Sequence, residues 1–172
     1  MRHVMVDIET LGSKVGSVIL SIGAVQFSPA PYTEFYRRID LASAVLAGLS
    51  IDSNTVKWWK EQAVEARYAA FFCCGGVTLG EALKDFADFV DKDTALWAKG
   101  PDFDCVLLEA AYQATGEKIP WSYRNTRDVR TIAALSEVKE ERVGIDHNAL
   151  DDAKNQAALV MKAHNVLKRP LQ

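Results

Sequence analysis

Apolar positions in the first forty residues occur in short runs with no helical spacing. Such runs fill residues 4–6, most of 17–27 and parts of 33–39, and their lengths are typical of β-strands. Turn-forming residues at 12–16 and 28–31 separate them. We therefore expect three strands joined by tight turns and paired antiparallel.

Beyond residue 40 the apolar positions recur mainly at helical intervals. This spacing predicts helices over residues 41–49, 54–62, 78–90, 103–114, 128–135 and 150–167, and a short apolar run predicts a buried strand at 94–98. Thr78 and Glu81 have capping-box spacing, Gly116 is expected to end the helix that starts near residue 103, and Asp102 to cap it. Three strands followed by helix–strand alternation predict an α/β fold, with a mixed sheet whose antiparallel part comes first and helices on its faces.

Composition narrows the class of protein. The 172 residues are 49% hydrophobic and 25% charged, which suits one domain over residues 1–172 with its own core and excludes disordered, collagen-like and disulfide-scaffold proteins. The longest apolar stretches, such as residues 68–74, are too short to span a bilayer. Asp7 falls where a signal peptide would be apolar, and Cys73 and Cys74 are adjacent and poorly placed to pair. We expect no membrane association and a cytoplasmic, reducing location.

The charge balance limits the partners. A net charge of −3 provides no basic footprint of the kind that duplex-binding proteins carry, so any contact with nucleic acid must be local or assisted by metal ions. The three histidines are scattered and no paired CxxC units occur, which argues against a structural zinc site. The charged run at residues 139–142 is expected to be an exposed loop or helix end.

Carboxylates supply the candidate chemistry. Asp7 and Glu9 end the first predicted strand, and residues two apart on a strand share a face, so both can bind one hard cation such as Mg²⁺ or Mn²⁺. Asp104 lies in the first turn of a predicted helix, where it could instead serve as a helix cap.

A third candidate group lies near the last helix. His147 precedes this helix, and Asp151 and Asp152 lie in its first turn. Helical periodicity alone does not choose between the two aspartates. Taken singly, each of the three candidate groups could have a structural role instead: Asp7 and Glu9 at a strand end, Asp104 as a helix cap and His147 as a solvated loop residue.

Together the motifs resemble the DEDD superfamily of 3'-5' exonucleases, in its histidine-containing (DEDDh, DnaQ-like) branch. Asp7-Ile8-Glu9-Thr10 matches the first motif, Phe103-Asp104 the end of the second, and His147 with Asp152 the His-x4-Asp third motif, in the same order over residues 3–165. Residues 16–24 and 127–131 are similar to the phage-type and ribonuclease T-like members. One departure is the stretch 99–102, where many relatives have an asparagine before Phe-Asp.

This resemblance implies a ribonuclease H-like, mixed five-stranded sheet flanked by helices. It also implies that Asp7, Glu9, Asp104 and Asp152 hold two Mg²⁺ or Mn²⁺ ions, and that His147 takes a proton from the attacking water. The expected activity is release of nucleoside 5'-monophosphates from the 3' ends of single-stranded nucleic acid, with DNA slightly favoured over RNA. A homodimer is compatible with the resemblance.

The expected substrate contacts follow from the same resemblance and from residue type. Thr10 and Leu11 match positions that contact the terminal nucleotide. Trp58 and Trp59 lie beside lysines, and we expect one of them, Trp59 in particular, to stack on a base. Arg127 and Arg130, one helical turn apart if this segment is helical, could hold phosphate or form salt bridges with neighbours near Asp128; of the two we expect Arg127 to contact the substrate.

Three alternatives stay open at this point. The chain could be a ribonuclease T-like exoribonuclease, a catalytically silent nucleic-acid-binding module of the same fold, or a phosphodiesterase acting on small phosphate esters.

Overall fold

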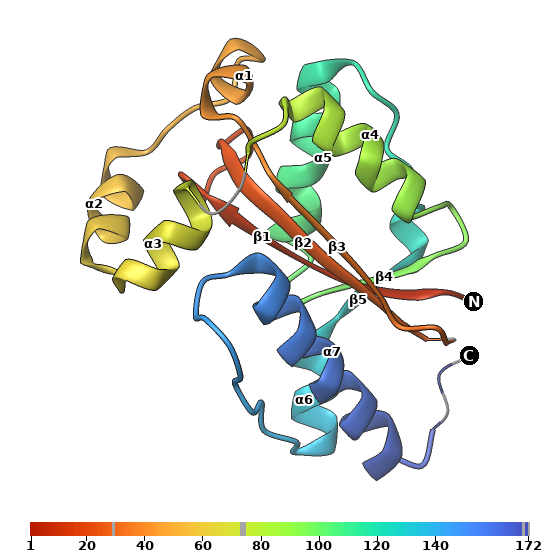
Figure 1. Cartoon of the computed structure of the whole chain (residues 1–172). Coiled ribbons are helices and arrows are strands. Elements are labelled where there is room, and N and C mark those ends of the chain that lie inside the picture. The colour runs from red at the N-terminus through yellow and green to blue at the C-terminus, as the bar shows by residue number, and fades with distance from the viewer. Residues whose placement is uncertain (29, 73–74, 170, 172) are drawn as a thin grey trace.

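The computed structural model describes residues 1–28, 30–72, 75–169 and 171. The predicted lack of pairing between Cys73 and Cys74 concerns residues outside this set. Within it, a five-stranded sheet runs through the middle of the molecule and helices cover both of its faces (Figure 1). This is the ribonuclease H-like α/β architecture that the sequence predicts.

The sheet has the strand order β3-β2-β1-β4-β5. Its strands are β1 (His3–Thr10), β2 (Ile19–Ser28), β3 (Thr33–Arg38), β4 (Ala95–Ala98) and β5 (Thr126–Asp128). The first three pair antiparallel, whereas β4 pairs parallel with β1 and with β5. The predicted mixed sheet with its antiparallel part first is therefore confirmed.

The helices lie in two groups on opposite faces of the sheet. They are α1 (Leu41–Leu46), α2 (Ser53–Glu61), α3 (Val64–Phe71), α4 (Leu79–Phe89), α5 (Asp104–Thr115), α6 (Val129–Ser136) and α7 (Ala149–Val166). Figure 1 shows α4 and α5 on one face and α6 and α7 on the other, with α1 to α3 beyond the end of the sheet where β1 finishes. A short 3₁₀ turn, Tyr123–Asn125, precedes β5.

The alternation of side chains along β1 divides the core between the two faces. Val4, Val6 and Ile8 belong to the cluster under α4 and α5, whereas Met5 belongs to the cluster under α6 and α7. Successive side chains of a strand point to opposite faces, so Asp7 and Glu9 share the face of Met5. The two carboxylates of β1 therefore point toward α7.

Three local expectations differ from the structure. Helix α3 has apolar residues on several sides and no side-chain hydrogen bond at its N-cap, so periodicity did not predict it. Strand β5 has only three residues and is recognised by its pairing with β4, so the sequence pattern did not predict it. Asp102 does not cap α5, whose N-cap is Phe103 with no capping side chain. The predicted capping box of α4 and the left-handed Gly116 that ends α5 are confirmed.

Gly23 allows α7 to lie directly on the sheet. It pairs with Asp7 across β1 and β2, and a Cβ atom at this position would lie 2.2 Å from the carbonyl carbon of Ala149 and 2.3 Å from the amide nitrogen of Leu150. Both are backbone atoms of the first turn of α7. Only a glycine lets this helix end approach β2 so closely.

The substitution Gly23→Ala should therefore destabilise the protein by at least the roughly 1–3 kcal/mol of an overpacked core, because the obstructing atoms are backbone and cannot rotate away. Gly80→Ala is a matched control, since Gly80 lies in α4 with open space around its Cβ position. This control should stabilise by about 0.5–1 kcal/mol. Urea denaturation of both variants measures the difference, and equal stability of the two would contradict this role of Gly23.

Candidate active site

One cleft at the end of β1 brings together the predicted catalytic residues. It has a volume of about 340 Å³. Its lining includes Asp7 and Glu9 from β1, Asp104 from the first turn of α5, and His147 and Asp152 from the start of α7 and the loop before it. These residues are separated by up to 145 positions in the sequence and converge only because β1, α5 and α7 meet at this end of the sheet.

Hydrogen bonds orient three of the carboxylates. The backbone N–H of Ile8 donates to Asp104 Oδ1 at 3.3 Å, and the backbone N–H of His147 donates to Asp152 Oδ2 at 3.1 Å. The side-chain amide of Gln156 donates to Asp7 Oδ1 at 2.8 Å. Each carboxylate group is therefore held by an element other than the one that carries it, or by the loop next to it.

The cleft makes ionisation of its carboxylates costly. Burial, followed by repulsion from Asp152 and Asp104, raises the pKa of Glu9 to about 8. Burial is also the main cause that raises the pKa of Asp104 to about 7, and it raises the pKa of Asp7 and of Asp152. Bound cations would remove this cost, because an opposite charge favours the ionised carboxylate.

The donor set fits a hard divalent cation. Ligand atoms of Glu9, His147 and Asp152 all lie within 4.8 Å of one another, and Asp7 and Asp104 interact electrostatically with this group. Carboxylate oxygens are the ligands that Mg²⁺ and Mn²⁺ prefer. The buried Oε1 atom of Gln156 has no hydrogen-bond partner among the described residues, so a further polar group can still be bound there.

The first turn of α7 distinguishes Asp151 from Asp152. Asp151 Oδ2 accepts a hydrogen bond of 2.9 Å from the backbone N–H of Ile145, and its carboxylate lies against Gly144. Asp152 lines the cleft instead. Asp151 therefore holds the loop before α7, whereas Asp152 faces the other carboxylates.

Aromatic side chains fix the position of His147. This residue has a left-handed backbone with φ of 61°, which is uncommon for a residue other than glycine. Its ring packs edge to face against Trp58, with ring centroids 4.9 Å apart, and lies 6.1 Å from the ring of Trp59. Helix α2 thus covers one side of the histidine.

The predicted substrate contact of Trp59 is not supported by its position. Trp59 is 2% exposed and its indole N–H donates to the carbonyl oxygen of Thr10 at 2.9 Å, whereas Trp58 is 40% exposed. Trp59 is a core residue that ties α2 to the end of β1. The tryptophan available to a base is Trp58.

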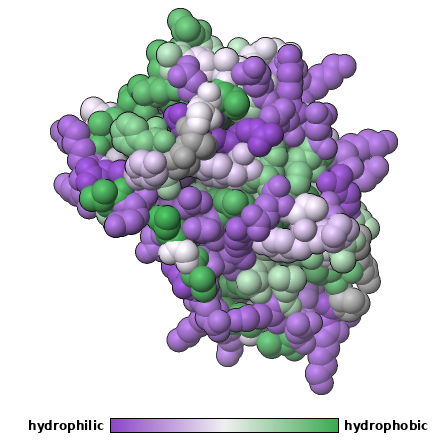
Figure 2. Space-filling model, in the orientation of Figure 1, coloured by the Kyte–Doolittle hydropathy of each residue, from purple (hydrophilic) through white to green (hydrophobic). Residues whose placement is uncertain are grey.

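Thr10 and Leu11 lie beside the cleft but are mostly buried. Thr10 donates its hydroxyl hydrogen to the carbonyl oxygen of Gly12 at 2.8 Å. Leu11 is 3% exposed and lines an apolar cavity of about 300 Å³ together with side chains of α1, α2 and α3. Hydrophobic side chains are also gathered over this part of the surface in Figure 2.

Arg127 is not brought to the cleft. Its Nη1 atom donates to the carbonyl oxygens of Arg124 and Thr126, and it lines another cavity with Met1, His3 and Trp97. The reason is the register of the strands. Arg127 pairs with Trp97 of β4, and Trp97 pairs with Met5 of β1. Arg127 is therefore level with Met5, two residues before Asp7. Arg130, three residues later in the first turn of α6, lines the carboxylate cleft instead.

Several cleft residues were missed from the sequence. Gln156 lies one helical turn after Asp152, a spacing that could have revealed it. Lys99 and Arg142 also line the cleft, and Glu140 binds both, with Oε2 at 2.6 Å from Lys99 Nζ and 3.6 Å from Arg142 Nε. The charged run 139–142 is thus not simply an exposed loop, because the Glu140 side chain is only 14% exposed.

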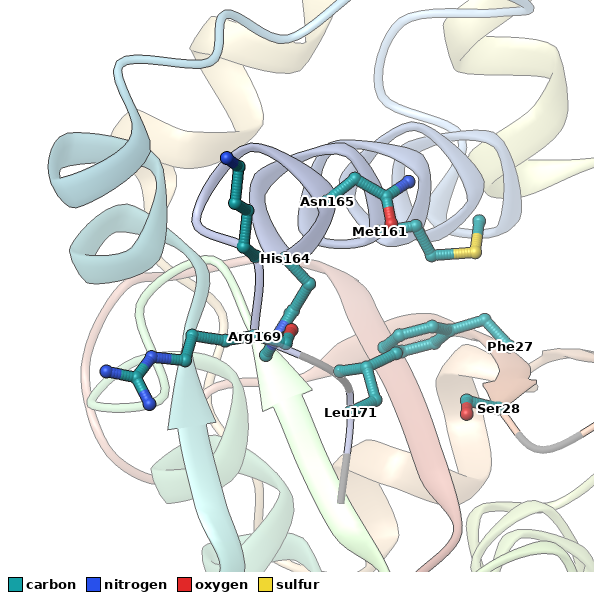
Figure 3. A pocket seen from close by; sticks show the side chains of 8 residues that line it. Phe27, Ser28, Met161, His164, Asn165, Arg169 and Leu171 are labelled. Atoms are coloured by element: carbon teal, nitrogen blue, oxygen red, sulfur yellow. Dashed lines mark hydrogen bonds between the residues drawn. The ribbon is translucent and has the colours of Figure 1, made fainter.

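A separate cavity of about 460 Å³ lies at the C-terminal end of α7 (Figure 3). It is lined by Phe27, Met161 and Leu171 with several basic residues, and the His164 Nδ1 atom lies 2.7 Å from the carbonyl oxygen of Arg169. Figure 3 shows the Arg169 side chain extending away from Phe27. No carboxylate is among its described lining residues, so this cavity lacks the ligands of a hard-metal site.

Comparison with known families agrees with the geometry of the cleft. The family model described as the 3'-5' exoribonuclease Rv2179c-like domain matches residues 2–164. The chain belongs to this family. It is accordingly a 3'-5' exonuclease. Among curated proteins, none matches the chain significantly.

Solved structures of nucleases share the fold. The crystal structure of cell-death related nuclease 4 (CRN-4) superposes with a TM-score of 0.58 at 11% identity, covering 95% of this chain and 64% of CRN-4. The nuclease domain of 3'hExo, a DEDDh family member bound to rAMP, has a TM-score of 0.59 at 13% identity and covers 95% of this chain and 92% of that domain. At these identities the likeness concerns the fold alone.

The raised carboxylate pKa values predict how the stability of the metal-free protein depends on pH. The folded protein retains protons on Glu9 and Asp104 that the unfolded chain releases near their ordinary values of 4.5 and 3.8. The free energy of unfolding in EDTA should therefore fall as pH rises from about 4.5 toward 8. Urea denaturation across this range measures the effect, and Mg²⁺ should restore stability at the alkaline end.

Glu9→Gln provides the control, because its amide stays neutral at every pH in this range. Its stability in EDTA should depend less on pH than that of the wild type, and it should exceed the wild type near pH 8. A wild-type stability that is flat or rises over this interval would contradict the pKa shifts.

Proposed function

We propose that the chain is a metal-dependent exonuclease that removes nucleoside 5'-monophosphates from the 3' ends of single-stranded RNA. The observation that carries this proposal is the convergence of Asp7, Glu9, Asp104 and Asp152 with His147 in one cleft. A module that had lost catalysis would have no reason to keep four carboxylates together at this electrostatic cost.

The roles of the residues follow from their chemistry. Asp7, Glu9, Asp104 and Asp152 would hold two Mg²⁺ or Mn²⁺ ions, as divalent ions are used throughout the DEDDh superfamily. When bound, the ions would supply positive charge that stabilises the phosphoryl displacement. Gln156 orients Asp7, and the backbone of His147 orients Asp152.

His147 would accept the proton of the attacking water. An imidazole ring offers a nitrogen that can accept a proton from water. Trp58 packs against the ring and limits its motion on one side. The same exposed indole can stack on a base of the incoming strand, as aromatic side chains in single-strand-binding sites do.

We propose RNA rather than DNA as the substrate for two reasons. The matching family is described as exoribonuclease, and the structurally similar nuclease domain of 3'hExo was crystallised with rAMP. The slight preference for DNA predicted from the sequence rests on likeness to phage-type exonucleases. It stays a prediction, and a direct comparison of the two substrates tests it.

The remaining predictions concern organisation. We propose that residues 1–172 form a single exonuclease domain. A homodimer and a cytoplasmic location stay predictions. Among the described residues, no helix is long and apolar enough to cross a membrane.

The activity is tested with 5'-labelled single-stranded RNA and DNA of the same sequence, incubated with Mg²⁺, Mn²⁺ or EDTA. We expect a ladder that shortens from the 3' end, mononucleotide products, faster loss of RNA and no reaction in EDTA. A 3'-blocked strand should survive. Full activity in EDTA would contradict the metal-dependent mechanism, and cleavage of circular single strands would indicate an endonuclease.

His147→Ala and Asp152→Asn should fail in different ways. His147→Ala removes the proton acceptor, so turnover should fall by about 100- to 10,000-fold while the Mn²⁺ concentration needed for half-maximal rate changes little. Asp152→Asn replaces an anionic ligand by a neutral one and should raise that concentration. Rates measured against Mn²⁺ for both variants separate the two roles.

Asp151→Asn is the matched control for the second variant, because Asp151 lies next in the chain and holds the loop rather than facing the cleft. It should leave the Mn²⁺ requirement unchanged. Wild-type turnover in His147→Ala would place the base elsewhere, and a raised Mn²⁺ requirement in Asp151→Asn alone would transfer the ligand role to Asp151.

A further inference from the structure

Three cationic side chains, those of Lys99, Arg130 and Arg142, line the same cleft as the carboxylates, but they differ in their ion pairs. Lys99 pairs with Glu140 at 2.6 Å, and Arg142 pairs with Glu140 and with Asp146. Both are thereby partly neutralised. Arg130 is different, because its guanidinium forms no ion pair or side-chain hydrogen bond with any residue that the structure describes.

The position of Arg130 is defined by its helix. It is the second residue of α6, whose N-cap Asp128 accepts hydrogen bonds from the backbone N–H groups of Arg130 and Thr131. The first turn of α6 is thus fixed at the end of β5. The Arg130 side chain extends from there to the cleft lined by Asp104 and His147.

Gly100 provides the space in which this guanidinium lies. It has a left-handed backbone with φ of 109°, and a Cβ atom there would be 2.4 Å from Arg130 Nη1. Gly100 is in the turn between β4 and α5, in the stretch that departs from the pattern of many relatives. Any larger residue would displace the arginine from its position beside the cleft.

The charge of Arg130 influences the carboxylates of the cleft, although no carboxylate of the described residues neutralises it in an ion pair. Its proximity lowers the pKa of Asp104, against the larger effect of burial, while Asp102 acts in the opposite direction. Arg130 forms no ion pair with either aspartate within the described structure. A guanidinium has five N–H donors in a planar fork that matches the oxygens of a phosphate.

We propose that Arg130 binds a backbone phosphate of the nucleic-acid strand whose 3' end enters the cleft. The inference rests on the proposed function for the nature of the ligand. It also explains how a protein with a net charge of −3 can bind a polyanion: Arg130, seated over Gly100, supplies local positive charge at the point where the strand reaches the carboxylates.

The test measures binding separately from cleavage. A 5'-fluorescent single-stranded RNA is titrated with Arg130→Ala, Arg130→Lys and wild-type protein in Ca²⁺, with intact RNA verified on a gel, at several KCl concentrations. Arg127→Ala is the matched control, since Arg127 lies three residues earlier and outside the cleft. Thermal melting shows whether each variant is folded.

Arg130→Ala should raise Kd by about 10- to 100-fold, the effect of a lost charged hydrogen-bond pair. It should also reduce the slope of log Kd against log salt by about 0.7, the value for one phosphate contact on a single strand. Arg130→Lys should keep the wild-type slope and recover only part of the affinity, because it keeps the charge but not the fork. Arg127→Ala should change neither quantity.

Wild-type Kd and slope in Arg130→Ala would overturn the inference, as would equal losses in Arg127→Ala and Arg130→Ala, which would indicate general electrostatic attraction. If the wild type degrades RNA but Arg130→Ala binds normally, this inference alone fails. If the wild type binds RNA through Arg130 but degrades no nucleic acid, the proposed function fails and the phosphate contact stands.

Discussion

The close approach of α7 to the bare backbone of Gly23 is the constraint on which the active site depends. Gly23 pairs with Asp7 in the neighbouring strand, so the helix that lies over Gly23 begins beside the first carboxylate. From this position the first turn of α7 carries Asp152 to the same cleft, and the second carries Gln156. A helix displaced by one methyl group would carry both side chains, and the loop with His147, away from β1.

This approach produces a second constraint, the mutual repulsion of four carboxylates in a poorly solvated cleft. The raised pKa values of Glu9 and Asp104 measure its effect. The fold does not remove the repulsion with neighbouring cations alone, because Lys99 and Arg142 are paired with Glu140 and only Arg130 is unpaired among the described cleft residues. Bound divalent ions would relieve this repulsion, and their binding would then be linked to folding.

The loop between α6 and α7, which carries His147, is held in place by contacts with α7 and α2. Asn155 binds the backbone N–H and carbonyl of Val143, and Asp151 binds the backbone N–H of Ile145. At the other end of the loop, Trp58 packs on His147. His147 is thus held by α2 and α7 together, although its backbone has a left-handed conformation that the loop alone would not favour.

The sequence by itself determined the first three strands, most of the helices, the capping box of α4 and the end of α5 at Gly116, because these depend on local periodicity and on spacing along the chain. The order and spacing of the motifs also indicated the carboxylates, through their resemblance to a known superfamily. Helix α3 and strand β5 have too weak a local pattern to be predicted in this way. It could not distinguish Asp151 from Asp152, Trp58 from Trp59, or Arg127 from Arg130. Neighbouring residues have similar chemistry, and the packing of α7, α2 and β5 decides that Asp152 and Arg130 line the cleft and that Trp58 is the exposed tryptophan. Only the tertiary structure distinguishes the members of these pairs, because the register of β5 against β4 and the position of α7 on Gly23 are set by contacts between residues far apart in the chain.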